Sequence, residues 1–240
     1  MYLEKYSVLY CWIHKVASSS WKKIFFEMNN MVVPEDSFLH IASHIFRPKE
    51  DVPLQDLFDN STVSFAFVRH PFERLVSVYR DKFELSTEAE REQFFFKHYG
   101  AEIMANSDLS HPTGKMPSFP QFVSYLLNTP PLDYNYHWLP YWMHCQFCHN
   151  KFSVIGMFET IKEDIEYIIN DSNLNINSSS FPWINSHLSI NSNHRQLSLK
   201  YFNEIDEESL KKLYNIYKYD FEMFGYNVND YIGKSQNKYF

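Results

Sequence analysis

Three short apolar runs, each followed by a segment with helical spacing of its apolar residues, set the pattern of this chain. The runs are residues 7–13 (SVLYCWI), 62–68 (TVSFAFV) and 152–158 (FSVIGMF). Runs of this length that are rich in β-branched and aromatic residues predict buried strands. Because strands that alternate with helices pair in parallel, the pattern predicts an α/β fold with three layers around a mainly parallel sheet.

Helices are predicted after each strand and again near the C-terminus. After the second strand, Phe72, Leu75, Val76, Tyr79 and Phe83 recur at helical spacing and form one apolar face. The same reasoning predicts helices over residues 19–31, 118–128, 160–170 and 206–224. Residues 84–118 are hydrophilic and irregular. We therefore expect a single domain over residues 1–240 with an insertion or lid at about 84–118.

Composition narrows the class of protein. Hydrophobic residues make up 45% of the 240 positions, which is enough for a core and argues against disorder. The net charge of −7 argues against a protein that coats nucleic acid, although a local basic pocket remains compatible with it. No apolar run reaches the roughly 20 residues of a membrane span, and no signal-peptide pattern is visible. Asn60, Asn170 and Asn177 begin sequons that could carry glycans in a secretory protein.

The end of the first predicted strand has the layout of an anion-binding loop. Lys15 and the serines Ser18, Ser19 and Ser20 stand between the strand and a helix that begins near Trp21. Serine hydroxyls and the first amides of a helix donate hydrogen bonds to an anion, and the helix dipole favours one there. The loop lacks the glycines of a nucleoside triphosphatase loop. A plain serine N-cap beside a solvated lysine is the alternative.

The second predicted strand ends in a similar way. Arg69 closes it, and Ser77 follows eight residues later on the next helix. An arginine and a hydroxyl in this arrangement can grip one phosphate from two directions. The alternative is an ordinary helix that carries exposed Glu73, Arg74 and Arg80. Two such sites on adjacent strand–helix units predict a nucleotide that is phosphorylated at both ends of its ribose.

These two motifs resemble those of a known family. Residues 14–22 (HKVASSSWK) resemble the 5′-phosphosulfate loop of the Golgi carbohydrate sulfotransferases, sulfotransferase family 2, and residues 65–83 (FAFVRHPFERLVSVYRDKF) resemble their 3′-phosphate motif. The likeness continues in order to residue 226, and it is greatest to the chondroitin/dermatan 4-O and HNK-1 sulfotransferase group. His14, His70 and Met157 depart from the family pattern, as do the three serines and Gln146-Phe147.

The resemblance implies a P-loop-like fold that binds 3′-phosphoadenosine 5′-phosphosulfate (PAPS) and hydrolyses no nucleotide. Arg69 and Ser77 would bind the 3′-phosphate, and Lys15 would also stabilise the oxygen that leaves during transfer. Trp21 either packs near the adenine or fills the core. The residues implied for the 5′ side of the donor are His14, Lys15, Val16, Ala17, Ser18, Ser19, Ser20 and Trp21.

The acceptor side is less sharply defined. A hydroxyl acceptor needs a base, which histidine supplies near neutral pH. His40 is the first candidate because the family carries a histidine between the two nucleotide motifs, and His44 and His137 are the alternatives. The resemblance favours Arg195 for acceptor binding, and His137, Lys115 and Lys200 are further candidates.

The mechanism requires no metal. The segment 144–149 (HCQFCH) lacks the companion pair of a zinc site, and Cys11 lies in a strand. We therefore expect either a local disulfide between Cys145 and Cys148 or free thiols.

The function expected from the resemblance is transfer of a sulfuryl group from PAPS to a glycan or glycosaminoglycan hydroxyl. A relative that binds PAPS or glycan without turnover is the alternative, and the missing glycines disfavour a nucleotide kinase. We expect no nucleic-acid partner. The resemblance places the protein in the Golgi lumen, held at the membrane by an N-terminal anchor that this chain does not contain.

Overall fold

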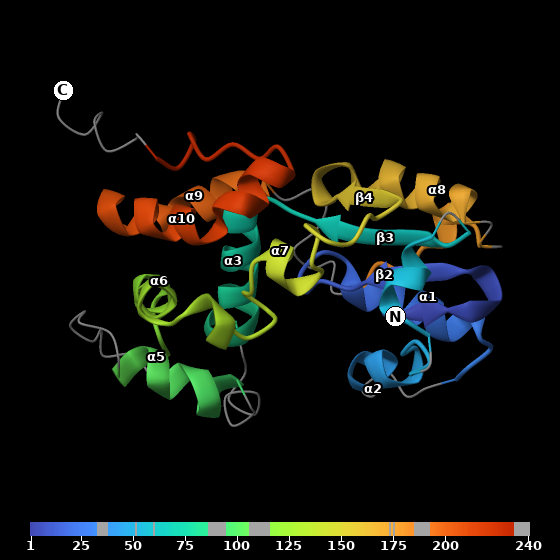
Figure 1. Cartoon of the computed structure of the whole chain (residues 1–240). Coiled ribbons are helices and arrows are strands. Elements are labelled where there is room, and N and C mark those ends of the chain that lie inside the picture. The colour runs from blue at the N-terminus through green and yellow to red at the C-terminus, as the bar shows by residue number, and fades with distance from the viewer. Residues whose placement is uncertain are drawn as a thin grey trace. The chain divides into compact units, whose positions relative to one another are not determined.

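The computed structural model contains two compact units, each of which is described here by itself (Figure 1). The first unit comprises Met1–Arg69 and Tyr141–Ile190, and the second comprises His70–Pro140 and Asn191–Phe240. The structure describes residues 1–32, 38–50, 52–59, 61–85, 95–105, 116–172, 174, 176–184 and 193–232.

The first unit is built on a four-stranded sheet. Its strands are β1 (Tyr2–Leu3), β2 (Val8–Cys11), β3 (Val63–Val68) and β4 (Val154–Met157), in that spatial order. β2, β3 and β4 run parallel, while β1 is antiparallel to β2. The predicted mixed α/β fold with a mainly parallel sheet is therefore confirmed. Each predicted strand contains an observed strand, and only the two-residue β1 was not predicted among the strands of the described residues.

Helices of the first unit pack against this sheet and against one another. The sequence after β2 forms α1 (Ser18–Met28), which packs with α2 (Phe38–Ile45). The chain returns from the second unit through α7 (Tyr141–His144), and α8 (Ile161–Asp171) packs on β4. Short 3₁₀ turns complete the unit: η1 (Glu4–Tyr6), η2 (Leu54–Phe58), η6 (Phe158–Thr160) and η7 (Ser178–Ser180).

An aromatic cluster between α1 and the sheet forms the core of this unit. Side chains alternate between the two faces of a strand, so Phe65 and Phe67 share a face, and Tyr10 lies opposite Phe65 in the register of the sheet. The ring centroid of Trp21 lies 4.6 Å from that of Phe65, and Tyr10 stacks on Phe65 at 4.7 Å. The Phe67 ring needs Gly156 on β4, because a Cβ there would lie 2.4 Å from it.

The second unit is helical in its described part. Its elements are α3 (Pro71–Tyr79), η3 (Arg80–Glu84), η4 (Phe96–Gly100), α5 (Ala101–Ala105), α6 (Phe119–Asn128), η5 (Pro131–Asp133), α9 (His194–Phe202) and α10 (Glu207–Met223). α3 begins with Pro71, which is tolerated there because the first turn lacks an amide partner. α3 packs with α6, α9 and α10. Trp138 is fully buried, and its carbonyl accepts a hydrogen bond from the Tyr217 hydroxyl at 2.5 Å.

The predicted helices that end at residues 128, 170 and 224 are observed with bounds shifted by one residue or less. The first predicted helix is shorter than expected and ends at Met28, and α9 was not predicted. Within the predicted insertion, residues 95–105 are helical, and much of the remainder lies outside the described residues. The single domain with a lid at 84–118 stays a prediction. No helix in the described ranges is long and apolar enough to span a bilayer.

Candidate donor-binding site

The loop between β2 and α1 has an unusual backbone conformation. Lys15 and Ala17 both have positive φ angles, 71° and 59°. Non-glycine residues seldom adopt this left-handed region, because their Cβ approaches the backbone there. Such conformations persist only where surrounding structure enforces them, and they concentrate at functional sites. The alternation of conformations turns the chain sharply from the end of β2 into the first turn of α1.

The N-terminus of α1 fits an anion. Its N-cap is Ala17, whose methyl group cannot accept a hydrogen bond from the first-turn amides, and its first turn carries no acidic residue. The helix dipole therefore leaves positive potential at this end, offset by no carboxylate of its own first turn. Ser18 is buried, and the buried Ser20 hydroxyl accepts a hydrogen bond from the Ile184 amide at 3.1 Å. A phosphate or sulfate group matches this donor set.

A second lysine lies one turn further along α1. Lys22 is 5% exposed, and its ammonium nitrogen lies 4.0 Å from the centroid of the Trp12 ring. Burial lowers the pKa of Lys22 from 10.5 to about 8, because a charge is less stable away from water. The His14 ring contacts Trp12 edge-on at 4.8 Å. The loop is therefore flanked by a buried cation that the spacing of its residues did not predict.

Arg69 stands at the end of β3, the neighbouring parallel strand, and is held on both its backbone and its side chain. Its amide donates a hydrogen bond to the Tyr141 hydroxyl at 3.2 Å, and the same hydroxyl donates to the Arg69 carbonyl at 2.9 Å. The guanidinium carbon lies 4.5 Å from the centroid of the Phe158 ring, next to the end of β4. Because ligands of parallel sheets bind at the carboxyl ends of strands, Arg69 and the Lys15 loop share the relevant edge.

Ser77 belongs to the second unit, where it lies buried on α3. Arg69 is the last residue of the first segment of the other unit. Binding of one phosphate by Arg69 and Ser77 together therefore stays a prediction.

The candidate bases lie in different places. His40 and His44 are both in α2, so the stretch that holds them is helical. His44 is exposed, and the side chain of His40 is outside the described part of the structure. His137 belongs to the second unit, and its Nδ1 lies 2.6 Å from the Asn135 side-chain oxygen. The structure does not select among the three.

The acceptor candidates are also in the second unit or outside the described residues. Arg195 stands in the first turn of α9 and forms an ion pair with Asp230. Lys200 is exposed in the last turn of the same helix. Lys115 and the sequon residue Asn60 lie outside the described residues.

Trp21 is part of the core of the first unit. Trp21 is fully buried, and its ring packs against Tyr10, Phe65, Phe67 and Phe181. Val16 is fully buried as well. Contact of Trp21 with an adenine stays a prediction.

The expectation for the cysteines is wrong for Cys145. It forms a disulfide with Cys11 across 134 residues of sequence, and Cys148 is the free, exposed cysteine. Sequence spacing favoured a local pair, but the fold brings the end of β2 beside α7. The described residues contain one group of potential metal ligands, Cys11, His144 and Cys145, with donor atoms within 4.8 Å of one another. The disulfide leaves its two sulfurs without the thiolate that metal binding needs.

The Lys15 loop after β2 and Arg69 after β3 form a candidate anion site at the edge where two neighbouring parallel strands end. Residues 1–227 match the model of the sulfotransferase family. The chain therefore belongs to the sulfotransferase family, and this membership implies PAPS as the donor.

Curated relatives of the chain are named carbohydrate sulfotransferases. The chain is 27% identical to carbohydrate sulfotransferase 11 of Rattus norvegicus over 95% of this chain and 67% of the relative. It is 28% identical to carbohydrate sulfotransferase 10 of Gallus gallus over 95% of this chain and 66% of the relative. Against carbohydrate sulfotransferase 14 of Homo sapiens, identity is 32% over 69% of this chain and 44% of the relative. The chain thus spans about two thirds or less of these relatives. No solved structure matches it significantly.

Three residues near the site were missed by the sequence reasoning. Tyr141 and Phe158 hold Arg69, and Lys22 lies buried beside the loop. The register of β3 with β4 brings the segment of Phe158 beside Arg69, and local spacing does not reveal that pairing. Lys22 is the last residue of the motif at 14–22, so its position was available in the sequence but its burial was not.

Proposed function

We propose that this protein transfers the sulfuryl group of PAPS to a hydroxyl of a carbohydrate, either a chondroitin- or dermatan-like chain or a terminal sugar of a glycoprotein. The observation that carries the proposal is the loop of Lys15 and Ala17 at the uncapped N-terminus of α1, beside an arginine fixed at the end of the next strand. Family membership and the names of the relatives support the same reaction.

The chain's own residues would divide the work between the two ends of the donor. Ser18, Ser19 and Ser20 together with the first amides of α1 would bind the 5′ side. Arg69 and Ser77 would bind the 3′-phosphate, and Arg69 matches it well because a guanidinium binds phosphate with paired hydrogen bonds. When bound, PAPS supplies the sulfuryl group.

Lys15 would act on the charge that develops during transfer. In-line displacement of this kind depends mainly on positioning and on stabilisation of charge at the leaving oxygen. An ammonium group close to a helix N-terminus adds a full positive charge to the positive end of the helix dipole. The left-handed backbone at Lys15 holds the residue at the turn between strand and helix.

His40 remains the proposed base, with His44 and His137 as alternatives. Arg195 is proposed to bind the acidic acceptor after its ion pair with Asp230 breaks. An exposed ion pair of this kind contributes little stability, so an anionic ligand can replace the carboxylate. We propose the Golgi lumen as the location, on the family resemblance.

A transfer assay tests the proposed function. The protein is incubated with PAPS carrying radiolabelled sulfate and with chondroitin, dermatan and terminal glucuronyl acceptors. We expect label in at least one acceptor, and loss of that label in Lys15→Ala. A wild-type protein that binds PAP, the desulfated product of PAPS, but labels none of these acceptors would contradict the transfer reaction and support a binding protein.

A further inference from the structure

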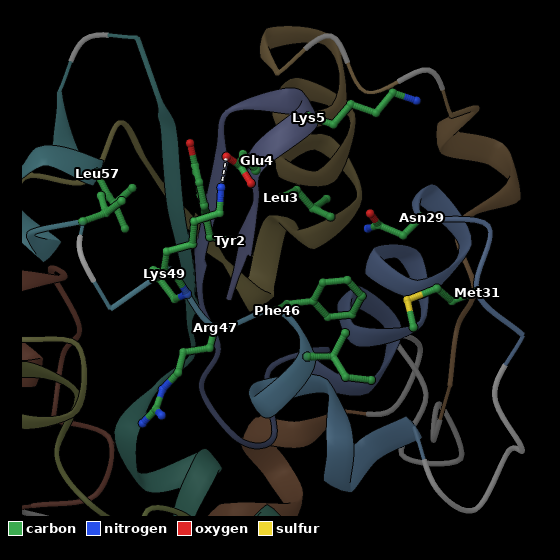
Figure 2. A pocket seen from close by; sticks show the side chains of 13 residues that line it. Tyr2, Leu3, Glu4, Lys5, Asn29, Met31, Phe46, Arg47, Lys49 and Leu57 are labelled. Carbon is green, nitrogen blue, oxygen red and sulfur yellow. Dashed lines mark hydrogen bonds and ion pairs between the residues drawn. The ribbon is translucent and has the colours of Figure 1, made fainter.

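A pocket opens in the first unit (Figure 2), near the end of the sheet at which β2 begins. Glu4 and Lys5 line it directly after β1, whose Leu3 pairs with the first residue of β2. Asn29 and Met31 line it just beyond the C-terminus of α1, whose N-terminus faces the loop. The 11 residues of α1 separate the two places by about 16 Å at 1.5 Å per residue. The pocket is therefore distinct from the proposed donor site.

The pocket has an apolar floor. Leu3, Phe46 and Leu57 line it and are at most 5% exposed. Met31 and Ile45 also line it, yet they leave 38% and 43% of their surface open to water. The volume is about 640 Å³, which lies in the range of roughly 300–1,000 Å³ typical of small-ligand sites. Such a surface favours a ligand that presents an apolar face.

Positive charge surrounds this floor. Lys5, Arg47 and Lys49 line the pocket together with one carboxylate, Glu4, whereas the whole chain has a net charge of −7. Lys49 pairs with Glu4 at 2.7 Å, but both side chains are about two thirds exposed, so this pair contributes little stability. Within the described ranges, neither Arg47 nor Lys5 forms an ion pair with a carboxylate. Figure 2 shows these two side chains extending on different sides of the pocket.

We propose that this pocket binds a segment of an acidic oligosaccharide. A sugar ring offers C–H groups that pack on apolar side chains, while uronate or sulfate groups pair with Lys5, Arg47 and Lys49. The Asn29 amide adds a neutral donor and acceptor for ring hydroxyls. The inference rests on the proposed carbohydrate acceptor and adds that the acceptor contacts the protein at a second place, away from the donor loop.

Binding at this distance from the donor loop predicts a dependence on chain length. An oligosaccharide long enough to reach both places gains the second contact as an intramolecular step, which strengthens binding without any new contact at the reacting hydroxyl. Short acceptors gain nothing from it. Because the rim is exposed, its contribution should weaken as salt rises.

The test measures binding directly, by calorimetry with unsulfated chondroitin oligosaccharides on the full chain saturated with PAP. Arg47→Glu and Lys5→Glu are each compared with Lys162→Glu, an equal change of charge on the exposed face of α8 outside the pocket. We expect each pocket variant to weaken binding about threefold or more, and Lys162→Glu to leave it nearly unchanged. Thermal unfolding and PAP affinity, measured for every variant, confirm that each is folded.

The pocket proposal is overturned if both pocket variants bind like Lys162→Glu, or if a neutral oligosaccharide of equal length binds wild type as tightly. It is equally overturned if wild type binds no chondroitin oligosaccharide. Sulfate transfer that continues in those cases leaves the proposed function intact. Pocket-dependent binding without any transfer would instead contradict the proposed function while supporting the pocket.

Discussion

The Tyr141 hydroxyl forms hydrogen bonds with both backbone polar groups of Arg69, accepting from its amide at 3.2 Å and donating to its carbonyl at 2.9 Å. Tyr141 is fully buried and stands 72 residues away in the sequence. One side chain thereby bonds both backbone groups of the residue that follows β3. The contact sets the backbone from which the guanidinium projects over the Phe158 ring.

Replacing Tyr141 with phenylalanine should loosen Arg69 without removing its charge. Tyr141→Phe leaves two buried backbone groups without this partner, which should lower the free energy of unfolding by about 2 kcal/mol. If Arg69 binds the 3′-phosphate, PAP affinity should also fall by about tenfold and KM for PAPS should rise, with kcat nearly unchanged. Urea unfolding, calorimetry and steady-state kinetics measure these effects.

Tyr10→Phe is the matched control in the same unit. Tyr10 is fully buried, burial raises its pKa, and its hydroxyl has no hydrogen-bond partner in the described part of the chain. Removing that hydroxyl should therefore leave stability equal or slightly higher and PAP affinity unchanged. Equal behaviour of Tyr10→Phe and Tyr141→Phe would contradict the positioning of Arg69 by Tyr141.

Lys15→Ala should separate catalysis from binding. Alanine keeps a Cβ at this left-handed position, so the backbone requirement is similar. Loss of a cation that stabilises developing charge typically costs about 100-fold or more in kcat. We expect that loss with PAP affinity kept within about fivefold, because the amides and serines of α1 remain. Lys23→Ala, a change of charge on α1 itself, should change neither. A Lys15→Ala protein with near-normal kcat would refute the assignment.

The Cys11–Cys145 disulfide should stabilise the region before the loop. It joins the end of β2 to the residue after α7, with Cα atoms 6.1 Å apart. Cys145→Ser should lower the free energy of unfolding by about 3 kcal/mol, because the unfolded chain regains a long open loop. Cys148→Ser, at the exposed free cysteine, should change it by less than about 0.5 kcal/mol. Thiol titration of the unfolded, unreduced protein should find one thiol, and three would contradict the pairing.

Lys22 should make stability depend on pH in alkaline solution. Burial lowers its pKa from 10.5 to about 8 in the folded protein, so between these values the unfolded chain binds more protons. Stability therefore rises with pH across this window, and the penalty of the buried charge is fully present below pH 8. The shift corresponds to about 3 kcal/mol, and this value already includes what the ammonium gains from its contact with the Trp12 ring.

Lys22→Met should thus be more stable than wild type at pH 7 by about 3 kcal/mol. The difference should shrink as the pH rises toward the ordinary lysine pKa of 10.5. Urea unfolding at pH 7, 8, 9 and 10 measures it, with Lys23→Met as the control on the same helix. Parallel pH profiles of wild type and Lys22→Met would contradict a lowered pKa of Lys22.

Local patterns predicted most of the fold, because its strands and main helices are encoded by the spacing of neighbouring residues. β3 and α10 appear within one residue of their predicted bounds. β1 escaped prediction because two residues carry no periodicity, and it is defined by pairing with β2. In α9, apolar and polar residues are poorly separated around the helix, so their spacing in the sequence does not predict a helix clearly.

The sequence predicted those site residues that directly follow a strand. The Lys15 loop and Arg69 follow strands directly, so their positions at one edge of the sheet follow from parallel topology. The contacts of Arg69 with Tyr141 and Phe158, and the bond between Cys11 and Cys145, join segments far apart in the sequence. Such pairs depend on the register of the folded sheet. The local spacing of residues does not reveal which distant segments that register brings together.

The most direct test of the account is calorimetric titration of the folded protein with PAP. We expect saturable binding to wild type, and binding weakened about 30-fold in Arg69→Ala, which loses charge-assisted hydrogen bonds to the 3′-phosphate. Adenosine 5′-phosphate, which lacks that phosphate, should bind both proteins equally weakly. Absence of heat with PAP and PAPS in wild type, or equal PAP affinity in Arg69→Ala, would contradict the donor site proposed at the ends of β2 and β3.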